Sequence, residues 1–261
     1  MTRQASVTGT FYPARIVELE RYFEHFSKIY DENFTLPTTK SRAVIVPHAG
    51  YIYSGYTANI AYRILQNSNI KNLVVIGPSH RISFEGISLC NFNTYQTPFG
   101  EINSAQELMK KLRSNFSFKC LQDAHIEHST EVQFPFIKYY MKDVNIIELV
   151  YSNTNPKNLS QIIDFILNQD NCGVVISSDL SHFYTLKDAN KLDNICLNAI
   201  KDLNLNLLND GCEACGKIGI EAMLMSAIKL NLKSQILDYR TSADASHDED
   251  KVVGYISACF D

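Results

Sequence analysis

The stretch AVIVPHAGYIYSG, residues 43–55, joins an apolar run to a segment of helical character through a turn that contains a histidine. The run Ala43–Val46 is rich in β-branched residues, which favours a buried strand. Ser54 can cap a helix that continues to about Gln66. A strand, a turn and a helix in this order are typical of one unit of an α/β fold.

The rest of the chain repeats this alternation of short apolar runs and helical segments. Ser104 and Glu107 form a predicted capping box for one of the helices. Further strands are expected at 73–76, 87–90, 146–151, 174–177, 235–239 and 252–258, and further helices at 105–112, 129–141, 156–168, 186–202 and 218–230. No repeat or linker interrupts the pattern, and the loop 31–39 is the one candidate hinge. We expect a single domain over residues 1–261, with a three-layer α/β/α fold around a mostly parallel mixed central sheet.

Composition excludes several classes of protein. The 261 residues carry a formal net charge of -4, and Lys and Arg form no basic stripe, which argues against nucleic acid as a partner. No apolar run approaches the ~20 residues of a membrane span, and the first six residues lack the apolar core of a signal peptide. We therefore expect a cytoplasmic protein without a membrane partner.

The cysteines are odd in number and scattered. Seven occur, at positions 90, 120, 172, 196, 212, 215 and 259. This is not the dense, even set of a secreted disulfide scaffold, so reduced thiols are expected, most of them buried as small apolar side chains.

Three histidines follow three different predicted strands. His48, His80 and His182 come shortly after the runs 44–46, 74–76 and 174–176. In an open α/β sheet, ligands bind beyond the carboxyl ends of the strands, so these imidazoles are expected to face one crevice. His25 and His247 have no such position and are expected at the surface.

Two imidazoles and one anionic ligand form a minimal site for a divalent transition metal. Asp179 and Glu131 are the carboxylate candidates for the third ligand. Cys212 and Cys215 are the thiolate candidates, in GCEACG (211–216) just before a predicted helix, whose N-terminus lowers a thiol pKa. A single C-x-x-C pair is weak evidence for zinc, and the residues alone leave the third ligand open.

Five motifs carry a resemblance to a known family. They are VPHAGYIYSG (46–55), GPSHR (77–81), EHSTEVQFPF (127–136), SSDLSHF (177–183) and ACGKIGIEAML (214–224). In this order and spacing they resemble the Memo family, whose prokaryotic members are called AmmeMemoRadiSam system protein B. The similarity extends from TFYP (10–13) nearly to the C-terminus.

The resemblance implies a fold shared with the class III extradiol dioxygenases (LigB-like), which use non-haem Fe(II), two histidines and a glutamate. In the Memo family a cysteine replaces that glutamate, so the implied metal ligands here are His48, His80 and Cys215. Cys212 lies outside the motifs and is expected to be a structural or incidental thiol. Thiolate is a softer ligand than carboxylate and favours copper or zinc, whereas the implied fold and the open coordination positions favour Fe(II). We rank Fe(II) first and copper second, with zinc also possible.

The resemblance also places Asp179 and His182 beside the metal. A hydrogen bond from His182 to Asp179 is expected to orient the imidazole, which can then act as an acid or base near neutral pH. His128, in the 127–136 motif, is expected to line the crevice and support the chemistry. His125 can line it too, and either of these two can instead bond the backbone at a helix start.

Substrate contacts are expected from Tyr51, Tyr53 and Arg81. Aromatic walls suit a flat organic substrate or a peptide side chain, although they suit an ordinary core equally well. Arg81 can hold a carboxylate or phosphate, with a surface salt bridge as the alternative.

Two functions follow from these expectations. The first is a metal-dependent redox enzyme with dioxygenase-like chemistry on a small molecule that the sequence does not identify. The alternative is a non-catalytic protein that binds a peptide or phosphopeptide in the same crevice. The resemblance further implies association with a radical SAM protein and an Ammecr-type protein.

Overall fold

A mixed β-sheet runs through the centre of the molecule. The computed structural model describes all residues from Met1 to Asp261. The strand order is β10 (Ser234–Thr241), β11 (Val252–Phe260), β2 (Ala43–Val46), β8 (Cys172–Ser177), β3 (Asn72–Pro78), β7 (Asn145–Tyr151) and β4 (Ile87–Ser88), with β9 (His182–Tyr184) paired to β11. The four inner strands β2, β8, β3 and β7 are parallel, and the others pair antiparallel. The predicted α/β fold with a mostly parallel mixed sheet is confirmed.

The inner strands read as continuous apolar runs because both of their faces are buried. Side chains alternate between the faces, so Val44 and Val46 enter one hydrophobic core while Ala43 and Ile45 enter the other. These two cores make the sheet the middle of three layers.

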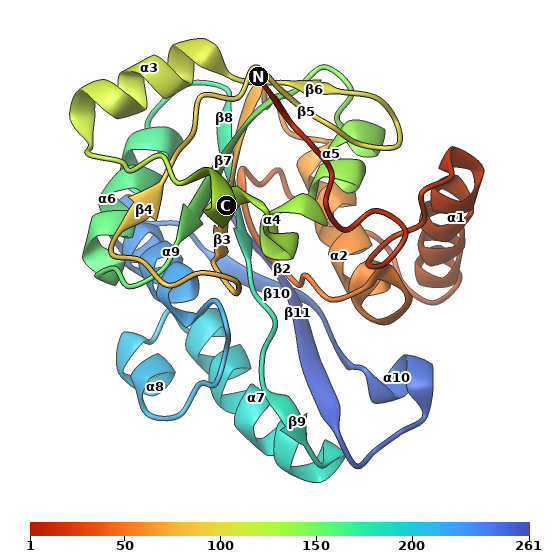
Figure 1. Cartoon of the computed structure of the whole chain (residues 1–261). Coiled ribbons are helices and arrows are strands. Elements are labelled where there is room, and N and C mark those ends of the chain that lie inside the picture. Colours follow the sequence, from red (N-terminus) through yellow and green to blue (C-terminus); the bar gives the residue numbers. More distant parts are fainter.

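Helices cover both faces of the sheet (Figure 1). One core is closed by α1 (Ile16–Asn33), α2 (Tyr51–Leu65) and α5 (Phe134–Tyr140), and the other by α3 (Gln106–Asn115), α6 (Pro156–Leu167), α7 (Leu186–Lys201), α8 (Leu205–Asn209) and α9 (Lys217–Leu230). Three short strands form a second, small sheet: β1 (Thr2–Arg3), β5 (Thr94–Tyr95) and β6 (Ile102–Asn103). The remaining short helices are the 3-10 helix η1 (Gln122–His125), α4 (His128–Glu131) and α10 (Ala243–Ser246). None of the helices has the length and apolar character of a membrane span.

Three local predictions were wrong. The helix expected over 129–141 is two helices, α4 and α5, because Pro135 has no backbone N–H and starts a new helix in its first turn. Ser54 does not cap α2, which already begins at Tyr51; its hydroxyl donates to Ala49 O instead. Ser104 makes no capping bond to α3, and its buried hydroxyl has no partner.

The expectation of reduced thiols was also wrong for four cysteines. Cys90 pairs with Cys120, and Cys196 pairs with Cys212. The partners are 30 and 16 residues apart in sequence, and their Cα atoms lie 4.7 and 4.8 Å apart. Spacing along the chain does not show which cysteines the fold brings within this bonding range. Cys212 is therefore half of a cross-link and not a free thiol.

Candidate metal centre

Three imidazoles converge at the carboxyl end of the parallel strands. The ligand atoms of His48, His80 and His128 all lie within 4.8 Å of one another, so the group can hold a metal ion. The ring centroids are 5.1 Å apart for His48 and His80, and 4.6 Å apart for His80 and His128. His48 is buried, His128 is half-buried and His80 is exposed, so the group opens to solvent beside His80.

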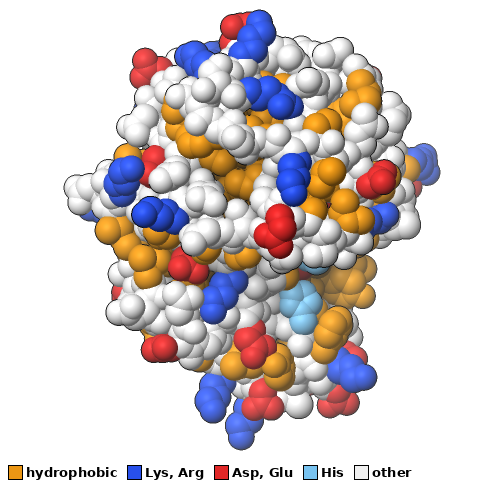
Figure 2. All heavy atoms as spheres, turned by 60° about the vertical axis from the view of Figure 1, so that its left-hand side comes forward, with side chains coloured by type: hydrophobic (Ala, Val, Ile, Leu, Met, Phe, Trp, Pro, Cys, Tyr) orange, Lys and Arg blue, Asp and Glu red, His pale blue; other side chains and the backbone are white.

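The sheet topology explains this convergence. His48 stands two residues after β2 and His80 two residues after β3, while Asp179 stands two residues after β8, which lies between those strands. Parallel strands end at one edge of the sheet, so three equivalent turns face the same point. His128 starts α4, which packs on β3 and β7. In Figure 2, histidine atoms reach the surface next to hydrophobic side chains.

Glu127 joins two of the imidazoles. Its Oε1 atom accepts a hydrogen bond from Nδ1 of His80 at 3.1 Å and lies 2.9 Å from Nδ1 of His128. Burial raises the pKa of Glu127, but the bonds from His128 and His80 outweigh it and hold this pKa well below its usual value. A carboxylate can only accept, so each Nδ1 carries the proton and each Nε2 keeps its lone pair for a metal.

Ser177 gives His48 the same tautomer. The Ser177 hydroxyl donates its one proton to Ser129 O, so it accepts from His48 Nδ1 at 2.9 Å. Burial, followed by the nearby His80 and His128, lowers the pKa of His48 well below its usual value. His48 is therefore neutral, which is the form that binds metal.

Cys215, the third predicted ligand, lies against His48. Its Sγ atom is 3.2 Å from His48 Nε2 and accepts a hydrogen bond from Asp179 N at 3.3 Å. It stands outside the group of three histidines whose ligand atoms all lie within 4.8 Å of one another. Burial, followed by the charge of Asp179, raises the pKa of the Cys215 thiol to about 12. The lowered pKa expected at a helix N-terminus is thus reversed, because desolvation outweighs the helix.

Asp179 binds His48 and not His182. Its Oδ1 atom accepts from the backbone N–H of His48 at 2.7 Å, and no hydrogen bond joins it to His182, contrary to prediction. Burial raises the pKa of Asp179 to about 7, although the backbone N–H groups of His48 and Ala49 act to lower it. His182 is half-buried on β9, and burial lowers its pKa. His182 is held by the pairing of β9 with β11 and not by Asp179.

The predicted substrate contacts differ in exposure. Tyr51 is 2% exposed, its ring packs on Phe136 and its hydroxyl donates to Val132 O, so it offers no surface to a substrate. Tyr53 is 42% exposed. Arg81 is exposed and forms no ion pair, so it is free to meet an anion. The substrate roles of Tyr53 and Arg81 stay predictions.

Two other candidates, His125 and Glu131, belong to buried hydrogen-bond networks of their own. His125 bonds Ser88 through Nε2 and Glu148 through Nδ1. The Glu131 carboxylate, weighed above as a metal ligand, accepts from Ser6 and from Tyr12 instead. Such saturated groups have no atom left for a metal. His25 and His247 are exposed, as predicted.

The sequence reasoning missed Glu127 and Phe11. Glu127 is fully buried and directly precedes His128 in the 127–136 motif, which was the available signal. The Phe11 ring lies 4.7 Å from the ring of His128, and Phe11 O accepts from Tyr51 N at the start of α2. The N-terminal segment therefore forms one wall of the site.

Comparison with known proteins gives one consistent result. A family model described as Memo-like protein matches residues 3–259. A MEMO1 family protein of Methanobrevibacter smithii is 33% identical over 100% of both chains, and one of Aquifex aeolicus is 31% identical over 99% of this chain and 98% of its own. A MEMO1 family protein of Thermoplasma volcanium is 30% identical over 98% of this chain and 97% of its own. The chain belongs to the Memo family.

Proposed function

We propose that the protein is a metal-dependent oxidoreductase that holds one transition-metal ion through His48, His80 and His128, with Cys215 as a fourth, anionic ligand. One observation carries the proposal: Nδ1 of each of the three imidazoles lies against a hydrogen-bond acceptor, which favours the tautomer with an unprotonated Nε2. Orienting partners of this kind are the usual support of metal-binding histidines. The geometry thus favours His128 as the third ligand beside His48 and His80, a position that the sequence analysis assigned to Cys215.

The three histidines and the cysteine have the ligand atoms that a transition-metal ion requires. Three neutral imidazoles suit iron, copper or zinc, and a thiolate adds softness and one negative charge. We rank Fe(II) first and copper second, and both would supply electron transfer that zinc cannot. The exposed edge at His80 gives a substrate access to the ion.

Asp179 is the group best placed to move a proton. Its Oδ1 atom is engaged by the His48 backbone, while Oδ2 lies 3.9 Å from His48 Nε2. With a pKa near 7, this carboxyl can hold or release a proton at neutral pH. His182 can serve the same purpose from the β9 side.

Turnover tests the proposal. Protein purified without oxygen and loaded with Fe(II) or Cu is supplied with catechol-type substrates, and oxygen uptake is recorded. His48→Ala should abolish metal-dependent uptake, while His25→Ala, which changes an exposed histidine, should match the wild type. No metal-dependent uptake by fully loaded protein across the substrate panel would contradict the oxidoreductase proposal.

A second candidate is recognition of an anionic peptide, favoured by the unpaired guanidinium of Arg81 next to His80. Binding of a phosphopeptide that survives chelators but is lost in Arg81→Ala would support it. Association with a radical SAM protein or an Ammecr-type protein is a proposal from family membership, and copurification tests it.

A further inference from the structure

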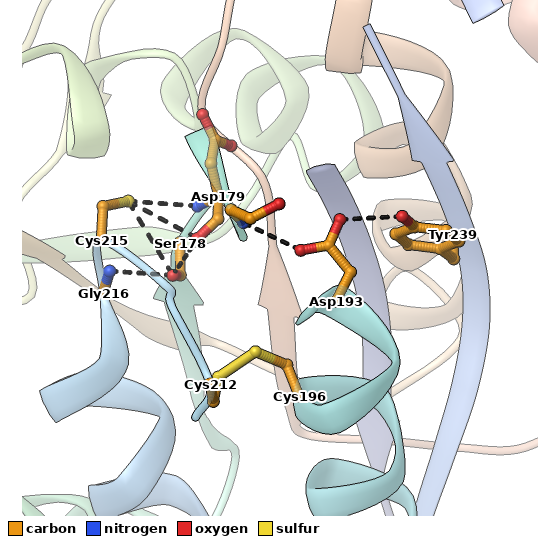
Figure 3. Close-up of a disulfide and its surroundings, with 9 residues drawn as sticks. Ser178, Asp179, Asp193, Cys196, Cys212, Cys215, Gly216 and Tyr239 are labelled. Atoms are coloured by element: carbon orange, nitrogen blue, oxygen red, sulfur yellow. Dashed lines mark hydrogen bonds between the residues drawn. A yellow bond between two sulfur atoms is a disulfide. The ribbon is translucent and has the colours of Figure 1, made fainter. Parts of the chain in front are cut away.

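Cys215 reaches the site on a short segment between two helices. Residues 210–216 connect α8 to α9 and belong to no strand. Gly216 N donates to Ser178 Oγ at 2.9 Å, and Cys215 N donates to Asp179 O at 3.3 Å. These bonds tie only the end of the segment to the loop after β8 (Figure 3). The beginning of the segment has a backbone bond to α8, from Cys212 N to Leu208 O at 3.3 Å, and an exposed bond, from Tyr184 OH to Glu213 Oε2 at 2.7 Å.

The Cys196–Cys212 disulfide is the one covalent anchor of this segment. Cys212 stands three residues before Cys215, and the disulfide fastens it to the middle of α7. Both cysteines are buried. The Cys215 side chain points away from this disulfide, toward Ser178 and the backbone of Asp179 (Figure 3). Cys215 is therefore not a third partner of the bond, and the C-x-x-C pair is not a redox dithiol.

Helix α7 is itself fixed next to the metal centre. Asp193, one helical turn before Cys196, accepts from Ser181 N at 2.9 Å. It also accepts from Tyr239 OH at 2.8 Å (Figure 3). Gly254 makes room for this carboxylate, because a Cβ atom there would lie 2.0 Å from Asp193 Oδ2. One helix thus holds both the loop that carries Asp179 and, through the disulfide, the segment that carries Cys215.

We propose that Cys196 and Cys212 are positioning residues for the Cys215 ligand, and that reduction of their disulfide weakens retention of the metal. The inference rests on the proposed role of Cys215 as a ligand. A metal ligand must be held within about 0.5 Å of its productive position. A segment released at Cys212 keeps its hydrogen bonds, among them those of Cys215 and Gly216 to the loop after β8, but loses its covalent link to α7. An external dithiol would supply the two electrons and two protons: it becomes a disulfide, and Cys196 and Cys212 become thiols.

The second disulfide is a matched control. Cys120 is separated from Glu127 and His128 by η1, which is fixed independently because His125 bonds Glu148. Removing Cys90–Cys120 therefore deletes a cross-link of the same kind without freeing a proposed ligand.

Cobalt(II) is the probe, because a cobalt–thiolate bond gives a charge-transfer band in the near ultraviolet that imidazoles do not give. Full-length wild type, Cys196→Ala/Cys212→Ala and Cys90→Ala/Cys120→Ala are titrated with Co(II), and Cys215→Ser identifies the thiolate band. We expect the Cys196/Cys212 variant to bind cobalt about 10- to 100-fold more weakly, with a reduced thiolate band. The Cys90/Cys120 variant should keep both the affinity and the band.

Wild type that is reduced and then freed of reductant provides a second test without mutation. It should behave as the Cys196/Cys212 variant does, and reoxidation should restore the band. Unchanged affinity and band, both in reduced wild type and in the folded variant, would overturn the inference. Wild type that binds cobalt without a thiolate band would also overturn the inference, but it would leave the proposed histidine site intact. Wild type that binds no cobalt at all would contradict the proposed function itself.

Discussion

The Oε1 atom of Glu127 lies 2.9 Å from Nδ1 of His128, inside the protein, with the same atom 3.1 Å from Nδ1 of His80. One buried carboxylate therefore orients two imidazoles. Glu127→Gln keeps the volume but loses the charge and can accept fewer bonds, so metal affinity should fall about 10- to 100-fold. Titration with Zn(II) measures the metal affinity. The control is Glu107→Gln, which changes a glutamate in an exposed ion pair with Lys110. An affinity within twofold of wild type would mean that Glu127 has no such role.

A Tyr51 variant tests whether this residue acts in the hydrophobic core or in substrate binding. Tyr51→Phe removes the bond to Val132 O and leaves that carbonyl without its partner, which should cost about 1–3 kcal/mol of unfolding free energy. Metal binding by the folded variant should be unchanged, since the ring stays in place. Denaturant unfolding and a Zn(II) titration measure the two quantities. A variant of wild-type stability with an impaired metal site would contradict this account of Tyr51.

Gly216 should tolerate no larger residue. A Cβ atom at this position would lie 2.6 Å from Ser178 Cβ and 2.7 Å from Ser177 O. Gly216→Ala should therefore push the Cys215 segment away from the loop after β8, cost about 1–3 kcal/mol and weaken metal binding. Gly50→Ala is the control, because its Cβ would meet neighbours at ordinary contact distances, 3.5 Å or more. Equal metal affinity in both variants would show that the segment position does not matter.

A buried charge network should make the fold sensitive to acid. Burial raises the pKa of Glu148, but Arg3 and His125 outweigh it, so the pKa lies below its ordinary value of 4.5. The stability from this depressed pKa is present above about pH 4.5 and is lost as the pH falls through the folded-state pKa. Glu148→Gln should lose about 1–3 kcal/mol at neutral pH, because Arg3 and His125 lose a charged partner while Arg3 keeps its ion pair with Glu131.

The same variant should also lose less of its remaining stability between pH 5 and pH 3 than the wild type does. Unfolding curves across that range measure both effects. Parallel pH profiles for the two proteins would contradict the assignment to Glu148.

The sequence predicted the parts of the site that depend on strand ends. His48, His80 and Asp179 follow buried apolar runs, and parallel strands end at one edge of the sheet, so their convergence could be expected. The alternation of apolar runs and helical segments predicted the layered fold for the same reason. Both follow from local patterns that repeat along the chain.

The contacts that complete the site depend on tertiary packing. His128 and Glu127 lie on no predicted strand end, and only the docking of α4 on β3 and β7 brings them to the other imidazoles. The pairing of Cys212 with Cys196 likewise depends on how the segment before α9 lies against α7. The C-x-x-C spacing of Cys212 and Cys215 gave no indication of this pairing.

Metal stoichiometry tests the central claim most directly. Wild type, His128→Ala, Cys215→Ala and the surface control His25→Ala are purified without oxygen from unsupplemented cells, and their metal content is measured by elemental analysis. We predict about one equivalent of iron or copper in wild type and His25→Ala, a loss in His128→Ala and a partial loss in Cys215→Ala. Full metal content in His128→Ala would contradict a centre built on His48, His80 and His128.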